Sequence, residues 1–361
     1  MSCSPLMTPP RPSRRRARAL VRRRRRRAAL LGALALAAAA IAVAVASSGH
    51  GRQRVRTTAQ SAHGRRAPHA PARHLSPVGL PLAKPAFALS GLGAFGQDPL
   101  QLEFHKPPRA GLLFDMSNGR VLWQRDPLAR LRIASLTKMM TALLVVRASP
   151  PGERVLVTKQ AVNAAGSKVG VLPKGRVVRL ESMLYGLLLP SGNDAAVALA
   201  QHVAGSVSRF VERMNREAAH LGLGCTRFSS PSGFIDRHNF SCARDLAVLA
   251  HVDLQQPRVA RVARSRSAVL PFPIKGGRLF LYNNNPMLIY RYPGATGLKT
   301  GYTVASGRCL VATAERHGVK LGAVLLDSPE PGIQARELLD RAFELVYGQA
   351  PVSERPFPPH A

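Results

Sequence analysis

The stretch RIASLTKMMTALLVV contains a serine and a lysine three residues apart, Ser135 and Lys138. Residues i and i+3 share one face of a helix, so the serine hydroxyl and the lysine amine can meet. A serine becomes a nucleophile when a base takes its proton, and a buried lysine near positive charge can be that base. Serine is also a favoured helix cap, and apolar residues recur at helical spacing after it. The stretch alone fits both a capped core helix and a nucleophile beside its base.

Two further short segments bear on this choice. Residues 191–193 read Ser-Gly-Asn and follow a proline that breaks residues 181–204 into two helical pieces, so their side chains should project into open space. Residues 299–301 read Lys-Thr-Gly inside the strand-like GLKTGYT, where the glycine would let a substrate approach the backbone. Each segment alone is more typical of a turn or a strand end.

The elements that must position these residues alternate in a simple order. Residues 109–126 predict a hairpin around an Asn-Gly turn, and residues 297–328 predict three strands joined by tight turns. Helical periodicity marks the chain between them, and a last helix is expected over residues 333–348. Strands at both ends with helices between them predict an α+β domain with one sheet built from both termini and a helical insertion.

Taken together and in this order, the three segments resemble the S-x-x-K, S-x-N and K-T-G elements of the penicillin-recognising serine enzymes. The similarity extends through GSKVGVLPKG, MLYGLLLPSGNDAAVALA and SGRCLVATAERHG, over about residues 104–330, to the D-alanyl-D-alanine carboxypeptidases among the low-molecular-weight penicillin-binding proteins. This resemblance implies a β-lactamase/transpeptidase-like fold, with an antiparallel sheet covered by helices and a helical subdomain. It implies a catalytic domain at residues 101–348, followed by a tail at 349–361.

The resemblance also implies a reaction, the removal of the terminal D-alanine from peptidoglycan stem pentapeptides through an acyl-enzyme, with covalent binding of penicillin. Ser135 would attack the carbonyl between the two D-alanines, and Lys138 would take its proton. Ser191 would pass a proton to the departing amine. The backbone N–H groups of Ser135 and Tyr302 would form the oxyanion hole.

Substrate-binding roles follow from the same resemblance. Asn193 would hold the substrate amide and position the lysine base, and Lys299 with Thr300 would bind the terminal carboxylate. Gly301 belongs to the K-T-G element. Many relatives carry histidine at the next position, where this chain has Tyr302, so the cleft lining is expected to differ there.

The sequence also bears on three other functions. A D,D-endopeptidase that cuts peptidoglycan crosslinks uses the same chemistry and stays open. A class A β-lactamase would need an E-x-x-x-N element, but the residues four places after Glu212 and Glu217 are Arg216 and Leu221. A non-catalytic wall-binding module is disfavoured because every motif residue is present. No cofactor or metal is expected, since no CxxC pair or His/Cys cluster occurs, and the oligomeric state stays open.

The N-terminal quarter carries a different signal. The chain has a formal charge of +33, and residues 1–97 contribute 18 basic and no acidic residues. Residues 1–27 predict a basic cytoplasmic segment, and the 19 apolar residues 28–46, about 28 Å long as a helix, predict a signal-anchor or a signal peptide. A nucleic-acid-binding arm is disfavoured because the apolar run follows the arginines at once. The enzyme is thus expected on the extracytoplasmic face of a bacterial membrane, or secreted to the wall if the signal is cleaved.

Residues 47–100 are rich in Pro, Ala and Arg and predict a flexible linker. Of the four cysteines, Cys3 would be cytoplasmic and Cys309 resembles a buried strand residue. A disulfide between Cys225 and Cys242 is possible in an exported domain, and the sequence leaves that pairing open.

Overall fold

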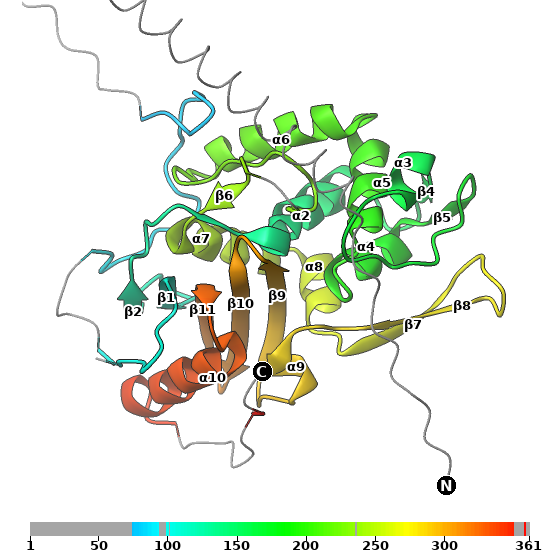
Figure 1. The fold of residues 1–361 in the computed structure, drawn as a ribbon. Coiled ribbons are helices and arrows are strands. Elements are labelled where there is room, and N and C mark those ends of the chain that lie inside the picture. The colour runs from blue at the N-terminus through cyan, green and yellow to red at the C-terminus, as the bar shows by residue number, and fades with distance from the viewer. Residues whose placement is uncertain (1–73, 94–98, 101, 235–236, 350–356, 359–361) are drawn as a thin grey trace, which may run out of the picture. The chain divides into compact units, whose positions relative to one another are not determined.

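A five-stranded antiparallel sheet lies at the centre of the described chain (Figure 1). The computed structural model describes residues 74–93, 99–100, 102–234, 237–349 and 357–358. The strands follow the order β2-β1-β11-β10-β9 and are β1 (Ala110–Asp115), β2 (Val121–Arg125), β9 (Ala295–Thr303), β10 (Gly307–Arg316) and β11 (Val319–Ser328). Every neighbouring pair is antiparallel. The prediction of one antiparallel sheet built from both ends of the domain is confirmed.

The central strands are buried on both faces, and their side chains alternate between two core clusters. In β1, Leu112 and Phe114 belong to one cluster and Leu113 to the other. In β11, Val324 and Leu325 divide in the same way. This period of two places each strand between two helical layers.

One face of the sheet packs against α7 (Ala243–Leu254), which lies beside α2 (Lys138–Ala148), and the opposite face packs against α10 (Pro331–Arg341) (Figure 1). A π-helical turn, η2 (Ala342–Val346), extends α10. The helical part beyond α2 contains α3 (Lys159–Val162), α4 (Leu180–Leu188), α5 (Asn193–Ala204) and α6 (Val207–His220). The predicted break at residues 190–192 is therefore confirmed, because it separates α4 from α5.

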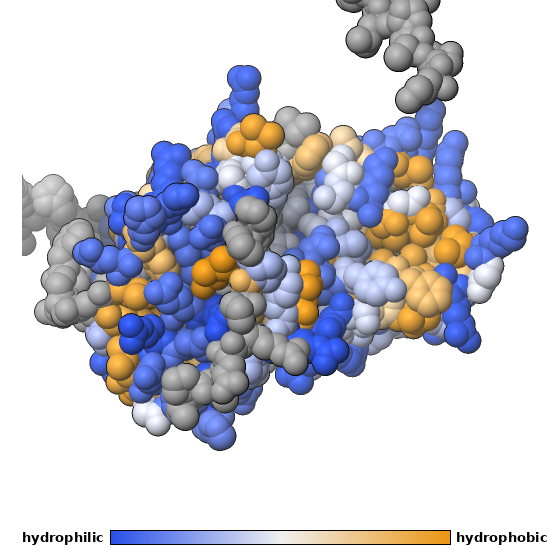
Figure 2. All heavy atoms as spheres, turned by 60° about the horizontal axis from the view of Figure 1, so that its bottom comes forward, coloured by the Kyte–Doolittle hydropathy of each residue, from blue (hydrophilic) through white to orange (hydrophobic). Residues whose placement is uncertain are grey.

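Three short strand pairs lie outside the sheet. They are β3 (Leu131–Arg132) with β6 (Phe240–Ser241), β4 (Arg154–Leu156) with β5 (Val177–Arg179), and β7 (Ser267–Pro271) with β8 (Arg278–Tyr282). Helix α8 (Pro257–Ala263) precedes the β7–β8 hairpin and α9 (Pro286–Ile289) follows it. The outward face of this hairpin exposes Val269, Phe280 and Tyr282. Figure 2 shows hydrophobic side chains gathered on the right of the view, the side on which the hairpin lies in Figure 1.

Residues 74–93 were predicted to be part of a flexible linker, and for them that prediction is wrong. The backbone N–H of Ala83 donates to the carbonyl of Ala219 at 3.0 Å. Phe87 is buried and stacks on the imidazole of His251, with ring centroids 3.8 Å apart. The Pro- and Ala-rich composition concealed this anchoring aromatic residue, whose burial holds the segment on the domain.

The predicted cytoplasmic segment 1–27, the apolar segment 28–46 and the linker up to residue 73 lie outside the described residues. In the part of the chain that the structure does describe, no helix has the length and apolar character needed to cross a bilayer.

Candidate active site

Ser135 lies in a single 3₁₀ turn, η1 (Ala134–Thr137), directly before α2. The turn packs against β9, and the following helix is anchored by Leu136, Met139 and Leu143, which are all fully buried. The prediction of a core helix that begins at the SLTK stretch is confirmed, with the serine one turn ahead of the helix proper. This burial fixes the direction in which the serine hydroxyl projects.

Lys138 is fully buried, and its ammonium group has three hydrogen-bond acceptors. Its Nζ donates to Ser135 Oγ at 2.9 Å, to Asn193 Oδ1 at 2.7 Å and to the backbone carbonyl of Ser232 at 2.9 Å. Burial lowers the pKa of Lys138 well below its usual value, the charge of Lys299 lowers it further, and Asp194 opposes the shift. Burial therefore favours the neutral form of the amine, which is the form that a general base requires.

Asn193 is the first residue of α5, and the loop between α3 and β5 holds its side chain in one orientation. Its Nδ2 donates to the carbonyl of Ala165 at 2.6 Å, and its backbone N–H donates to the carbonyl of Ser167 at 2.7 Å. With the Nδ2 side committed to Ala165, Oδ1 faces Lys138. A side chain at Gly166 would displace this arrangement, because a Cβ there would lie 2.6 Å from Asn193 Nδ2.

Ser191 occupies a left-handed backbone conformation, with φ of 65°, between α4 and α5. Its Oγ is buried and has no hydrogen-bond partner among the described residues, although Ser191 lines the same cavity as Ser135. A buried hydroxyl without a partner is uncommon in folded proteins and is a group that a ligand can use. A positive φ is strained for a residue with a side chain, and strain of this kind is common at functional sites.

Strand β9 passes very close to the serine turn. A Cβ at Gly301 would lie 2.9 Å from the carbonyl of Ile133 and 3.1 Å from the backbone N of Ser135, so only glycine fits here. Lys299, two residues earlier, is buried and donates from Nζ to the carbonyl of Thr300 at 2.8 Å. Burial lowers the pKa of Lys299 to about 7.

These residues surround a cleft with a volume of about 620 Å³. Of the predicted site residues, five line it: Ser135, Ser191, Thr300, Gly301 and Tyr302. The other three, Lys138, Asn193 and Lys299, are buried behind this lining. The structure therefore brings all eight to one place.

Sequence reasoning missed part of the lining, namely Ser167, Asn284, Pro286, Ile289, Tyr290, Arg308, Cys309 and Pro331. Arg308 is the charged side chain in this lining, and its Nη1 donates to the carbonyl of Pro329 at 2.6 Å. These residues come from four separate segments and belong to none of the three short motifs, although Ser167, Arg308 and Cys309 lie in the longer stretches that resemble the family. For Arg308, the available signal was the alternation of inward and outward side chains along β10, which places it on the opposite face from Cys309.

Cys225 and Cys242, whose pairing the sequence left open, form a disulfide with Cα atoms 5.7 Å apart, and Cys309 is a buried free thiol. Asp245 lies close enough to both sulfurs to complete a set of potential metal ligands. Because the sulfurs are bonded to each other, they are not thiolates available to a metal.

Comparison with known proteins identifies the family to which this chain belongs. The family model for D-alanyl-D-alanine carboxypeptidase matches residues 106–330, more than half of the chain. A D-alanyl-D-alanine carboxypeptidase of Bacillus subtilis is 32% identical over 243 residues, which are 65% of this chain and 62% of that protein. A D-alanyl-D-alanine endopeptidase of Pseudomonas aeruginosa is 32% identical over 237 residues, 62% of this chain and 76% of that protein.

The crystal structure of the Streptomyces K15 DD-transpeptidase superposes with a TM-score of 0.63 at 29% identity and covers 67% of this chain and 99% of its own. This match confirms the predicted transpeptidase-like fold. The chain spans about three fifths of the length of its Bacillus relative. On the family match over residues 106–330, the chain belongs to the D-alanyl-D-alanine carboxypeptidase family.

Proposed function

We propose that this protein is a serine-type D-Ala-D-Ala carboxypeptidase that removes the terminal D-alanine from peptidoglycan stem pentapeptides and is acylated by penicillin. The observation that carries the proposal is the 2.9 Å contact between Ser135 Oγ and the fully buried Nζ of Lys138, at the wall of an open cleft. A buried lysine beside a hydroxyl is the arrangement that activates a serine. The names of the similar proteins point to the same substrate class.

In the first half of the reaction, neutral Lys138 takes the Ser135 proton while Oγ bonds to the carbonyl carbon between the two D-alanines. The carbonyl oxygen becomes an oxyanion, which the backbone N–H groups of Ser135 and Tyr302 stabilise. The close approach of Gly301 to η1 supports this pairing of donors. The C–N bond then breaks, and the departing amine receives, through Ser191, the proton that Lys138 took. Water later attacks the acyl carbon and gives a proton to Lys138, which passes it to Ser135 Oγ as the C–Oγ bond breaks.

The substrate's C-terminal carboxylate would bind at the K-T-G end of the cleft. Thr300 lines the cleft there, and the buried amine of Lys299 donates to the Thr300 carbonyl. Arg308 adds a guanidinium to the same lining and forms the further cation that an anionic chain end requires. We propose that all three contribute to carboxylate binding, and that Asn193 holds the scissile amide.

A D,D-endopeptidase is the second candidate. The open cleft and the named endopeptidase relative support it, because a crosslinked dimer needs the same chemistry with room for a larger leaving group. A β-lactamase remains disfavoured by the missing E-x-x-x-N element.

The test uses the full chain with fluorescent penicillin and with diacetyl-L-Lys-D-Ala-D-Ala. We expect covalent labelling and release of D-alanine, both abolished by Ser135→Ala, since Ser135 Oγ is the hydroxyl that contacts Lys138 Nζ. Labelling that persists in Ser135→Ala would refute the nucleophile. If crosslinked dimers are cut while the tripeptide is not, the endopeptidase is the correct function.

We further propose that the domain acts outside the cytoplasm and is held at the membrane by residues 28–46, which lie outside the described residues. The disulfide supports an oxidising compartment, and the arginines before the apolar run support this orientation. N-terminal sequencing of the mature protein tests the anchor. A chain beginning at Ser47 would show that the segment is cleaved.

A further inference from the structure

The chain between Cys225 and Cys242 contacts Lys138. We name its described residues, 226–234 and 237–241, the cystine loop. Ser232, within it, supplies the backbone carbonyl that accepts the hydrogen bond from Lys138 Nζ at 2.9 Å. The other two acceptors of this amine come from η1 and α5. The cystine loop therefore provides one of the three contacts that fix the base.

The cystine loop makes further hydrogen bonds to η1 and to α2, the helix that begins with Lys138. Thr141 Oγ1, one turn along α2, donates to the carbonyl of Pro231 at 2.7 Å, and Asn239 Nδ2 donates to Thr137 Oγ1 at 2.6 Å. Gly233 packs so tightly that a Cβ there would overlap the backbone carbonyl of the first residue of η1. Movement of the cystine loop would therefore displace the turn that carries Ser135 and Lys138.

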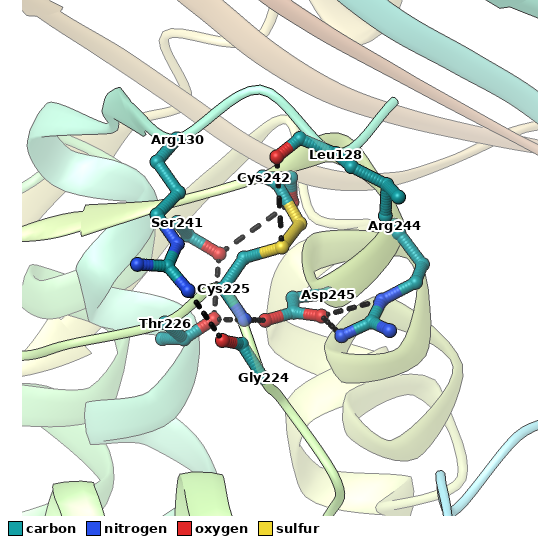
Figure 3. The surroundings of a disulfide bond; sticks show 9 residues. All are labelled: Leu128, Arg130, Gly224, Cys225, Thr226, Ser241, Cys242, Arg244 and Asp245. Carbon is teal, nitrogen blue, oxygen red and sulfur yellow. Dashed lines mark hydrogen bonds and ion pairs between the residues drawn. A yellow bond between two sulfur atoms is a disulfide. The ribbon is translucent and has the colours of Figure 1, made fainter. Parts of the chain in front are cut away.

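The two ends of the cystine loop are joined covalently and by a buried polar cluster (Figure 3). Asp245 Oδ2 accepts from the backbone N–H of Cys225 at 2.7 Å and from Thr226 Oγ1 at 2.7 Å. Thr226 Oγ1 also lies 2.8 Å from Ser241 Oγ, at the other end of the loop. Cys242 is the N-cap residue of α7, and Asp245 stands in the first turn of that helix. Both ends are thus held at the start of α7.

We infer that the Cys225–Cys242 disulfide and Asp245 are positioning residues for the reaction, which hold Lys138 in its buried, hydrogen-bonded place through the Ser232 carbonyl. This inference rests on the proposed function and adds to it a disulfide-dependent control of the general base. Separation of the loop ends would release Ser232 and admit water to the lysine. The charged groups that face Lys138 are Lys299 on β9 and Asp194 on α5, and neither belongs to the cystine loop.

The coupling between the disulfide and Lys138 predicts a change in the pH profile of the reaction, which a simple loss of stability does not predict. A hydrated Lys138 would hold its proton to higher pH, because the burial that disfavours its charge is reduced. The neutral fraction of the amine would fall at a given pH, and higher pH would restore it. A role confined to folding would lower the amount of active protein and leave the pH profile in place.

The experiment compares the full wild-type chain with the double variant Cys225→Ser/Cys242→Ser. The rate of Ser135 acylation by fluorescent penicillin is measured from pH 6 to 10. We expect the acid limb to move up by about one pH unit, so that the rate at a pH on this limb falls about tenfold and recovers at high pH. Asp245→Asn, which keeps the disulfide, should shift the limb in the same direction by less.

Leu338→Ala is the matched control, because Leu338 is fully buried in the core cluster on the α10 face of the sheet. This variant should lower the melting temperature and leave the acid limb unmoved. Reduction of the wild type offers a reversible form of the test. A dithiol gives two electrons and two protons to the cystine, leaves as a cyclic disulfide, and should produce the same shift, which reoxidation should reverse.

The titration of Lys138 can also be measured without catalysis. The Nζ resonance of Lys138 in ¹⁵N-lysine-labelled protein, assigned by its absence in Lys138→Met, reports the same titration by NMR. If wild-type protein is not acylated, the proposed function is wrong, while the NMR titration still tests the coupling. If the double variant keeps the wild-type acid limb and Lys138 titration, the disulfide does not position the base and the inference is overturned.

Discussion

Replacement of Asn193 by aspartate perturbs the proposed base in the most direct way. The change keeps the size of the side chain and places a carboxylate oxygen where Oδ1 now lies, 2.7 Å from Lys138 Nζ. A negative charge there favours the protonated amine and raises the pKa of Lys138. A protonated lysine cannot accept the Ser135 proton, so acylation should require higher pH.

The size of the effect follows from that distance. Two unit charges 2.7 Å apart attract with about 6 kcal/mol at an effective dielectric constant of about 20. If desolvation of the new carboxylate offsets half of this, about 3 kcal/mol remains, which corresponds to roughly two pKa units. We therefore expect Asn193→Asp to move the acid limb of the acylation profile up by about two pH units, a loss of on the order of 100-fold at a pH on that limb.

Stopped-flow measurement of Ser135 acylation by fluorescent penicillin between pH 6 and 10 provides the assay. Asn283→Asp is the matched control, because Asn283 is also buried and donates to two backbone carbonyls, of Ala263 and Ser265, without contact to Lys138. This control should lose stability but keep the wild-type limb. An acid limb in Asn193→Asp that coincides with wild type would refute the assignment of Lys138 as the base.

Three further predictions follow from other parts of the structure. Gly301→Ala should slow acylation at least about 100-fold, because the new Cβ pushes β9 away from the Ser135 N–H. Circular dichroism should show that the fold is intact. Acylation at a near-normal rate would exclude the oxyanion hole formed by Ser135 and Tyr302. Arg308→Gln should raise KM for diacetyl-L-Lys-D-Ala-D-Ala about tenfold and change kcat little, with Arg308→Lys intermediate; an unchanged KM would remove Arg308 from carboxylate binding. Burial raises the pKa of Asp253, whose two carboxylate oxygens have no partner among the described residues. The folded state therefore binds the carboxyl proton of Asp253 more tightly than the unfolded chain does. For this reason the contribution of Asp253 to stability falls as pH rises above about 4. Asp253→Asn should therefore raise the melting temperature by on the order of 3 °C at pH 8 and by less at pH 5, and a lower melting temperature at pH 8 would contradict this reading.

The sequence was sufficient for the parts of the site that depend on local patterning. The helical spacing after Ser135 predicted the buried stripe that fixes the serine turn, and Pro190 predicted the break between α4 and α5 in which Ser191 lies. Strands β9 to β11 were readable because their alternation and tight turns are local signals. The eight predicted site residues lie together in the structure, as the resemblance to the penicillin-recognising serine enzymes implied.

Contacts made by backbone atoms or by distant segments left no such signal. The Ser232 carbonyl holds Lys138, yet any residue type at that position carries a carbonyl group. The β7–β8 hairpin was missed because its turn has no Asn-Gly dipeptide and both strands are short. Phe87 is one aromatic residue in a Pro- and Ala-rich segment, so average composition hid the contact with His251 that holds the segment on the domain.

The central claim is that Ser135 is the nucleophile of this cleft, and its penicilloyl adduct tests that claim most directly. The full chain is incubated with penicillin, denatured, digested and mapped by tandem mass spectrometry. The structure predicts one adduct, on Ser135, in wild-type protein and none in Ser135→Ala. An adduct on Ser191 or on any other residue, or an adduct that persists in Ser135→Ala, would contradict the account.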